Sequence, residues 1–159
     1  MYKVLVSLIV VGLLLVACSD PLPTTLEIES EYGELKNTFQ KEQTSFEITT
    51  DKNMYILPVE KIKLHITNNG TTDIGYGGAL YLEKLEDGIW YEVPYQDNFT
   101  FTDEGLGLEP KATYEEELPL DFINYQLSLG TYRIIKKFWH DGEEVVLGSE
   151  FMLVEMVLE

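Results

Sequence analysis

The sequence predicts an all-β fold, a sandwich of about seven to nine antiparallel strands over residues 45–159, preceded by a signal peptide and a flexible tether. Three observations predict it. Apolar and polar residues alternate in strand-sized segments from Phe46 to Val154, separated by turn residues at intervals of roughly 8 to 15 residues. Asp-Gly pairs, which favour tight hairpin turns, occur at 87–88 and 141–142. Helical spacing of apolar residues is sustained nowhere in this region.

The first 18 residues have the layout of an export signal. Lys3 is followed by an apolar or small run from Val4 to Ala17, and then by the only cysteine, Cys18. This run is shorter than the ~20 residues of a membrane-spanning helix, so an uncleaved anchor is the weaker alternative. Residues 1–17 are therefore predicted to form a signal peptide.

The residues Leu15-Val16-Ala17-Cys18 resemble the lipobox of bacterial lipoproteins. The resemblance implies that Cys18 carries a diacylglyceryl group, with palmitate-type acyl chains, and fixes the chain to the outer face of the bacterial cytoplasmic membrane. A chance cysteine in an ordinary secretory leader is the alternative. If Cys18 is lipidated, no thiol remains for a disulfide, a nucleophile or a sulfur metal site.

Residues 18–44 are predicted to be the lipidated cysteine and an acidic tether. The segment is rich in Pro, Thr, Glu and Lys, and it has little alternation. A short helix around residues 31–40 is possible. The sandwich is expected to begin at Ser45.

The alternation of apolar and polar residues predicts the first two strands. Phe46 and Ile48 alternate with polar neighbours before a turn at residues 51–53, and Ile62, Leu64 and Ile66 do the same before the turn at 68–70. Both segments are predicted to be half-buried strands.

A hairpin centred on Asp87-Gly88 is the clearest local signal. If these two residues form a type I′ turn, the register pairs Leu85 with Trp90, Glu83 with Glu92, Leu82 with Val93 and Leu80 with Tyr95. The Leu80, Leu82, Val93 and Tyr95 face is then the core face. A one-residue slip would reverse the two faces.

The remaining strands are predicted at 114–120, at 131–139 after Gly130, and at about 144–154 after the turn at 141–142. Gly148-Ser149-Glu150 is interpreted as a bulge or bend in the last strand, rather than as a serine nucleophile.

Five segments together resemble the bacterial immunoglobulin-like domain found in lipoproteins of Gram-positive bacteria: residues 59–69, 74–77, 81–84, 88–94 and 129–134. The resemblance implies an immunoglobulin-like β-sandwich with no catalytic residues to carry over. The cysteine pair of antibody domains is absent. Tyr132 lies where a tyrosine corner is expected, with its hydroxyl bonded to an upstream backbone group.

Composition argues against several functions. A net charge of -17 makes nucleic acid an improbable partner. Only His65 and His140 are available to zinc, no serine lies in a nucleophile elbow, and the glycines at 75–78 lack the residues of a phosphate loop. These glycines are interpreted as permitting a bulge or a close strand approach. No cofactor and no enzymatic activity are expected.

Acidic side chains are the ligands that calcium takes, and the loops with Asp97, Asp103 and Glu104 are the place to look, but the spacing is not that of an EF-hand and no metal site is predicted. The run at 115–117 alternates sides of a strand and is interpreted as a solvated face.

Aromatic residues are the strongest candidates for partner binding. Seven of them lie between residues 76 and 101, and those left exposed would suit sugar rings or peptide side chains. The candidate residues are Tyr81, Trp90, Phe99 and Phe101, with a core position as the alternative for Trp90. The expected function is that of a non-enzymatic binding or accessory module, whose partner is an unknown protein or a cell-wall glycan.

The alternative function is that of an extracytoplasmic inhibitor or regulator of a protease or cell-wall enzyme. In that case the loop from Gln96 to Pro110 would insert into the target, because it is long and carries Phe99, Phe101 and Leu106.

Overall fold

A computed structural model describes residues 21–102 and 104–157. The predicted signal peptide, Cys18 and Asp103 lie outside the described residues. Within the described ranges no helix could cross a membrane.

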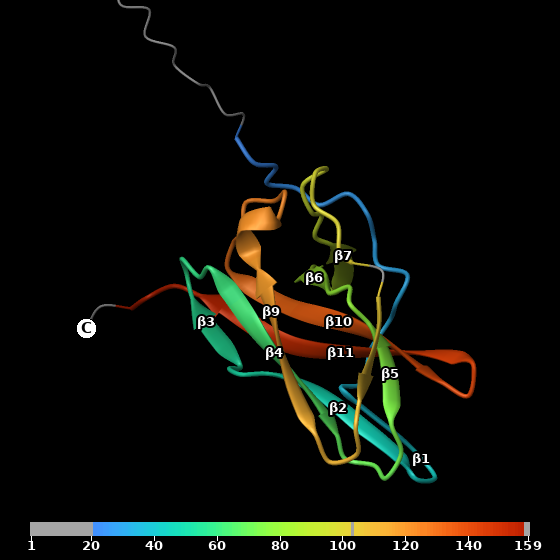
Figure 1. The fold of residues 1–159 in the computed structure, drawn as a ribbon. Coiled ribbons are helices and arrows are strands. Elements are labelled where there is room, and N and C mark those ends of the chain that lie inside the picture. The colour runs from blue at the N-terminus through green and yellow to red at the C-terminus, as the bar shows by residue number, and fades with distance from the viewer. Residues whose placement is uncertain (1–20, 103, 158–159) are drawn as a thin grey trace, which may run out of the picture.

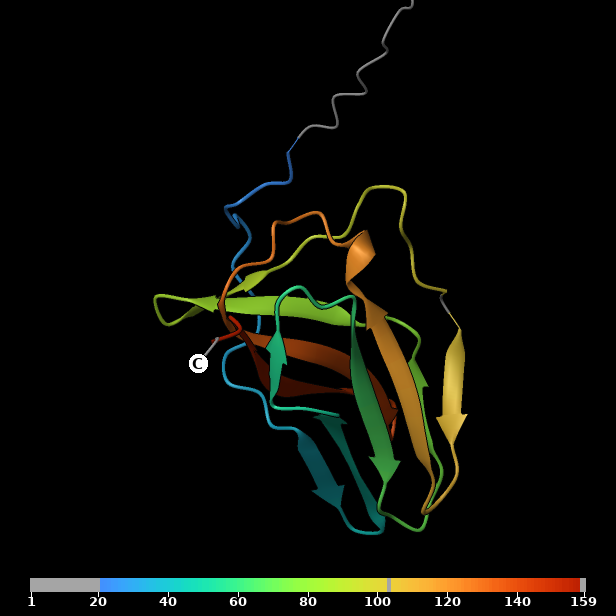
Figure 2. The same ribbon diagram turned by 90° about the vertical axis from the view of Figure 1, so that its left-hand side faces the viewer.

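The described chain forms two β-sheets packed face to face (Figures 1 and 2), which confirms the predicted sandwich. The four-stranded sheet has the order β1-β2-β4-β9, and the seven-stranded sheet has the order β3-β11-β10-β5-β8, with β6 paired to β10 and β7 paired to β6. The strands are β1 (Thr38–Lys41), β2 (Thr44–Thr50), β3 (Met54–Ile56), β4 (Lys61–Asn68), β5 (Ile74–Gly77), β6 (Tyr81–Glu86), β7 (Ile89–Glu92), β8 (Gly105–Leu108), β9 (Thr113–Pro119), β10 (Gly130–His140) and β11 (Glu143–Val154). A 3-10 turn, η1 (Leu120–Phe122), follows β9.

The core lies between the sheets. Side chains alternate between the two faces of a strand, so every second side chain of each strand points into the core. Ile62, Leu64 and Ile66 of β4 are fully buried, as predicted. They belong to the same buried cluster as Phe138 of β10, which contacts Phe46 of β2 with ring centroids 4.5 Å apart.

The predicted hairpin is confirmed with its register. Leu85 pairs with Trp90 and Glu83 with Glu92. Asp87 and Gly88 have φ of 50° and 83°, the left-handed values that a type I′ turn requires. Leu80, Leu82 and Val93 are buried, so the core face was assigned correctly.

Strand number and direction differ from the prediction. The described residues form eleven strands, and β3 runs parallel to β11, with Met54 beside Met152. The reason is local: the chain turns sharply after β2 at Asp51 and continues along the edge of the other sheet. Leu57 N–H donates to the Val154 carbonyl and completes this edge.

The segment predicted to be a tether lies against the sandwich. Residues 38–41 form β1 instead of a helix, because Phe39 pairs with Phe46 and stacks on it at 5.0 Å. Sheet structure therefore begins before Ser45. The N-terminal strap, defined here as residues 23–37, bonds to the domain along its length: Glu92 N–H donates to the Ile28 carbonyl and Gly148 N–H to the Lys36 carbonyl.

Gly148 and Ser149 do not form a bulge. Pairing between β10 and β11 is uninterrupted from Gly130 and Leu153 to His140 and Glu143. The glycine is needed for packing instead, because a Cβ on Gly148 would lie 3.0 Å from Leu35 Cβ of the strap. The Ser149 hydroxyl accepts a hydrogen bond from the Thr50 N–H at 3.0 Å.

The tyrosine corner is confirmed. The Tyr132 hydroxyl donates to the Ser128 carbonyl at 2.9 Å and accepts from the Ser128 N–H at 3.2 Å. The ring stacks on Phe151 in the core.

Candidate functional site

A register shift in the seven-stranded sheet opens a groove on its outer face. Tyr76 of β5 pairs with Phe138, whereas Tyr81 of β6 pairs with Ile135. Four residues, 77–80, therefore stand opposite the two residues Lys136 and Lys137 of β10. Such a bulge interrupts the ladder and redirects neighbouring side chains.

Two adjoining hollows lie at this bulge and share Tyr81 and Lys137. One has a volume of about 480 Å³ and is lined by residues that include Gly77, Gly78 and Trp139. The other has a volume of about 260 Å³ and includes Tyr32, Glu92 and Tyr95. We call the two hollows together the outer-face groove.

Gly77 and Gly78 line the larger hollow, where the lack of a Cβ allows a close approach to neighbouring groups. A Cβ on Gly77 would lie 3.1 Å from the Trp139 ring, and a Cβ on Gly78 would lie 2.9 Å from the Thr102 carbonyl oxygen. The interpretation of the glycines at 75–78 as permitting a bulge or a close approach is thus confirmed for Gly77 and Gly78.

Lys137 places a positive charge at the centre of the groove. Its Nζ lies 5.8 Å from the Tyr32 ring centroid, 5.6 Å from that of Tyr81, and 3.4 Å from a Glu144 oxygen. A hydrogen bond with Tyr32 is the main cause that raises the pKa of Lys137 to about 12. The ammonium is therefore fully charged near neutral pH.

Glu92 borders the smaller hollow and adds negative charge. Partial burial raises the pKa of its carboxyl, and repulsion by the Glu83 and Glu31 carboxylates raises it further. The groove thus offers a cation, a carboxylate and several aromatic rings at close range. The aromatic rings can stack on a flat ligand, and the ammonium and the carboxylate can form hydrogen bonds with its polar substituents.

The four predicted partner-binding residues do not form one site. Tyr81 lines both hollows and is 43% exposed. Trp90 is half-buried, and the Arg133 guanidinium carbon lies 4.2 Å from its ring centroid. Trp90 belongs neither to the hydrophobic core nor to the groove lining.

Phe99 and Phe101 pack mainly on other aromatic residues. Phe99 stacks on Phe122 of η1 at 4.6 Å and on Tyr95 at 5.0 Å, and it meets Phe101 edge to face at 4.9 Å. Phe101 reaches the edge of the groove. The loop predicted at 96–110 is shorter than expected, because residues 105–108 form β8 and pair with β5. This packing weakens the inhibitor hypothesis.

Two groove residues were missed by sequence reasoning. Trp139 is 47% exposed, and its signal was present: it follows the buried Phe138, so alternation directs it to the outer face. Tyr32 had no such signal, because its segment was assigned to the tether.

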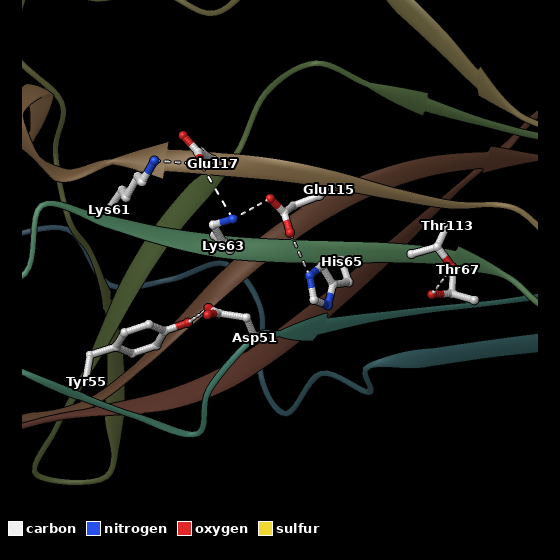
Figure 3. A network of polar contacts seen from close by, with 9 residues as sticks. All are labelled: Asp51, Tyr55, Lys61, Lys63, His65, Thr67, Thr113, Glu115 and Glu117. Atoms are coloured by element: carbon white, nitrogen blue, oxygen red, sulfur yellow. Dashed lines mark hydrogen bonds and ion pairs between the residues drawn. The ribbon is translucent and has the colours of Figure 1, made fainter.

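The outer side of the four-stranded sheet carries an exposed polar network (Figure 3). Glu115 of β9 bonds Lys63 at 2.6 Å and His65 at 3.1 Å, and Lys61 bonds Glu117 at 2.7 Å. The hydrogen bonds from Lys63 and His65 hold the pKa of the Glu115 carboxyl below its usual value. The solvated-face interpretation is therefore confirmed for Glu115 and Glu117.

Glu116 contradicts that interpretation, since it points between the sheets. Its Oε2 lies 2.6 Å from the Lys136 Nζ, and the Lys136 side chain is fully buried. Burial raises the pKa of Glu116 and lowers that of Lys136. The lysine Nζ also lies 5.1 Å from the Tyr76 ring centroid, so an aromatic ring packs beside this buried ion pair.

No group of three His, Cys, Asp or Glu side chains within residues 21–102 and 104–157 could hold a metal ion. Asp97 and Glu104 are exposed, and Asp103 is not among the described residues. The calcium hypothesis gains no support from the described loops.

Comparison with known proteins identifies one family. Residues 42–152 match a family model described as "Bacterial Ig-like domain". A search of the curated proteins gives no match.

Some solved structures are weakly similar to this chain. A β-glucosidase from Erythrobacter marinus is 15% identical, with a TM-score of 0.39, over 70% of this chain and 16% of its own. A β-glucosidase from Listeria innocua is 16% identical, with a TM-score of 0.38, over 72% of this chain and 17% of its own. A PapD-like domain of human CEP192 is 15% identical, with a TM-score of 0.36, over 80% of this chain and 98% of its own. The chain thus spans only a small part of the two β-glucosidases.

Proposed function

This chain belongs to the bacterial Ig-like domain family, and we propose that it is a non-enzymatic binding or accessory module, held on the outer face of the bacterial cytoplasmic membrane by a lipid on Cys18. Membership of the family supports the accessory role. The apolar run before Cys18 and the lipobox residues 15–18 support the anchor.

The observation that carries the binding role is the outer-face groove. Tyr81 and Trp139 are 43% and 47% exposed there, and Lys137 lines the same hollow with its charged ammonium 5.6 Å from the Tyr81 ring centroid. Aromatic faces stack on the C–H faces of sugar rings, while charged and polar groups bond the hydroxyls. We therefore propose a cell-wall glycan as the ligand class, and a protein partner is the competing outcome of the test.

The binding test compares the chain from Pro21 onward with single variants, using sedimentation with purified cell-wall glycan. Trp139→Ala and Tyr81→Ala should each weaken binding by about tenfold, because each removes a ring that contacts the ligand. Tyr114→Ala is the matched control, since Tyr114 is 46% exposed but lies on β9 of the other sheet. Equal binding by all folded variants, or no binding by the parent chain, would reject the glycan proposal.

The anchor is tested separately in a bacterial host grown with labelled palmitate. The full chain should carry the label and fractionate with membranes, whereas Cys18→Ser should carry none. An unlabelled parent chain with an intact leader would reject the anchor and leave the groove test unaffected.

A further inference from the structure

The chain enters the domain at one defined end. Figures 1 and 2 both show the segment after residue 20 arriving beside η1 and the neighbouring loops. The Gln126 N–H donates to the Pro23 carbonyl at 2.8 Å and fixes the entering chain there. Leu22, Phe122 and Leu129 are 44%, 41% and 51% exposed. We call this end of the sandwich the apolar end.

An open hollow of about 670 Å³ lies at the apolar end. Its apolar lining comes from the entering chain, from the segment before β4, from η1 and from the segment after η1: Leu22, Leu57, Val59, Leu120, Leu127 and Leu129. Asp121 and Glu155 also line it, and no Lys or Arg does. The surface is therefore apolar with a weakly acidic border.

The distance to the proposed anchor is short. Only three residues lie between Cys18 and Leu22, and a fully extended chain reaches about 14 Å over these four residue steps. The strap does not lengthen this connection beyond Leu22, because its backbone is hydrogen-bonded to the domain from Pro23 onward. A lipid on Cys18 would therefore bring the apolar end to the membrane surface, and no long tether would hold the domain away.

We propose that the apolar end rests on the bilayer, with Leu22, Phe122 and Leu129 in the lipid interface. This inference depends on the anchor proposed above. The side chains are of the kind that enters the interfacial region, and the acyl chains on Cys18 remove the entropic cost of finding the membrane. Because Asp121 and Glu155 are acidic, the contact should be closer on zwitterionic lipid than on anionic lipid.

The test uses the chain from Cys18 to Glu159, coupled through Cys18 to a maleimide phospholipid in phosphatidylcholine vesicles. A fluorophore is attached through a genetically encoded azido residue at position 129, or at position 109 in the turn before β9 as the matched control. Glu109 is exposed, and Figure 1 shows the turn between β8 and β9 at the end of the sandwich away from η1. Spin-labelled lipid should quench the fluorophore at 129 at least threefold more strongly than that at 109.

A second variant tests whether the apolar side chains make the contact. Leu22→Ser with Phe122→Ser should reduce quenching at position 129 toward the level at 109, and 30% phosphatidylglycerol should reduce it in the parent chain. Equal quenching at the two positions, or quenching at 129 that the serine variant leaves unchanged, would overturn the inference. Because the lipid is coupled chemically, this result is independent of whether cells lipidate Cys18.

Discussion

Arg133 joins three parts of the molecule through one guanidinium group. Its Nε and Nη2 bond the Glu83 carboxylate at 2.7 and 2.6 Å, and its Nη1 donates to the Gly33 carbonyl at 2.6 Å. The plane of the group covers the Trp90 ring. Arg133 and Glu83 are both almost completely buried, so each charge depends on the other for compensation.

Arg133→Met should destabilise the protein by about 3–5 kcal/mol, because the Glu83 carboxylate is left buried and unpaired. The measurement is urea denaturation followed by circular dichroism. The double variant Arg133→Met with Glu83→Gln should recover at least half of that loss, since it removes the uncompensated charge. Losses that simply add in the double variant would show that the two side chains are not energetically coupled.

At the scale of the element, the strap and β1 complete the sandwich although they precede the family match, which begins at residue 42. The strap runs beside buried outer-face residues of β10, and Leu35 fits against Gly148 of β11. Ile135 on that face is fully buried. Removing the strap would expose apolar surface that no other element can cover.

Three truncated chains distinguish the contribution of the strap to stability from that of β1: residues 21–157, 38–157 and 45–157. Loss of the strap should cost about 2–3 kcal/mol, and loss of β1 a similar further amount through Phe39. Urea denaturation of the three chains measures both steps. Equal midpoints for all three would show that the N-terminal contacts contribute nothing to stability.

At the scale of the whole molecule, the two sheets are joined by apolar packing and by the ion pair of Lys136 in β10 with Glu116 in β9. Because burial raises the pKa of the Glu116 carboxyl while the lysine opposes that shift, removing the lysine should raise the pKa further. The folded protein would then keep a proton at pH values where the unfolded chain has lost it.

The free energy of unfolding of the Lys136→Met variant should therefore fall relative to that of the parent chain as pH rises. A carboxyl with a raised folded pKa loses stability above its unfolded pKa, about 4.5, so the deficit should grow by about 2–3 kcal/mol between pH 4 and pH 7. Thermal and urea denaturation across this range measure it. The control, Lys136→Met with Glu116→Gln, should show a deficit that does not change with pH, and a pH-independent deficit in the single variant would contradict the prediction.

The local features of the fold were predictable from the sequence. Alternation placed Ile62, Leu64 and Ile66 in the core, Asp87-Gly88 set the hairpin register, and the position of Tyr132 after Gly130 indicated the tyrosine corner. Each of these depends on neighbours within about a dozen residues, because side-chain period and turn geometry are local properties of the chain.

Only the tertiary structure decided where the strap lies, that Glu116 pairs with Lys136 between the sheets, and that Tyr32, Tyr81 and Trp139 line one groove. These outcomes depend on partners far apart in sequence, as with Arg133 and Gly33, which are 100 residues apart. The local sequence around a charged or aromatic side chain is the same whether that side chain contacts solvent or a distant strand in the folded protein. Burial and pairing, which fix its role, exist only once the sheets have packed.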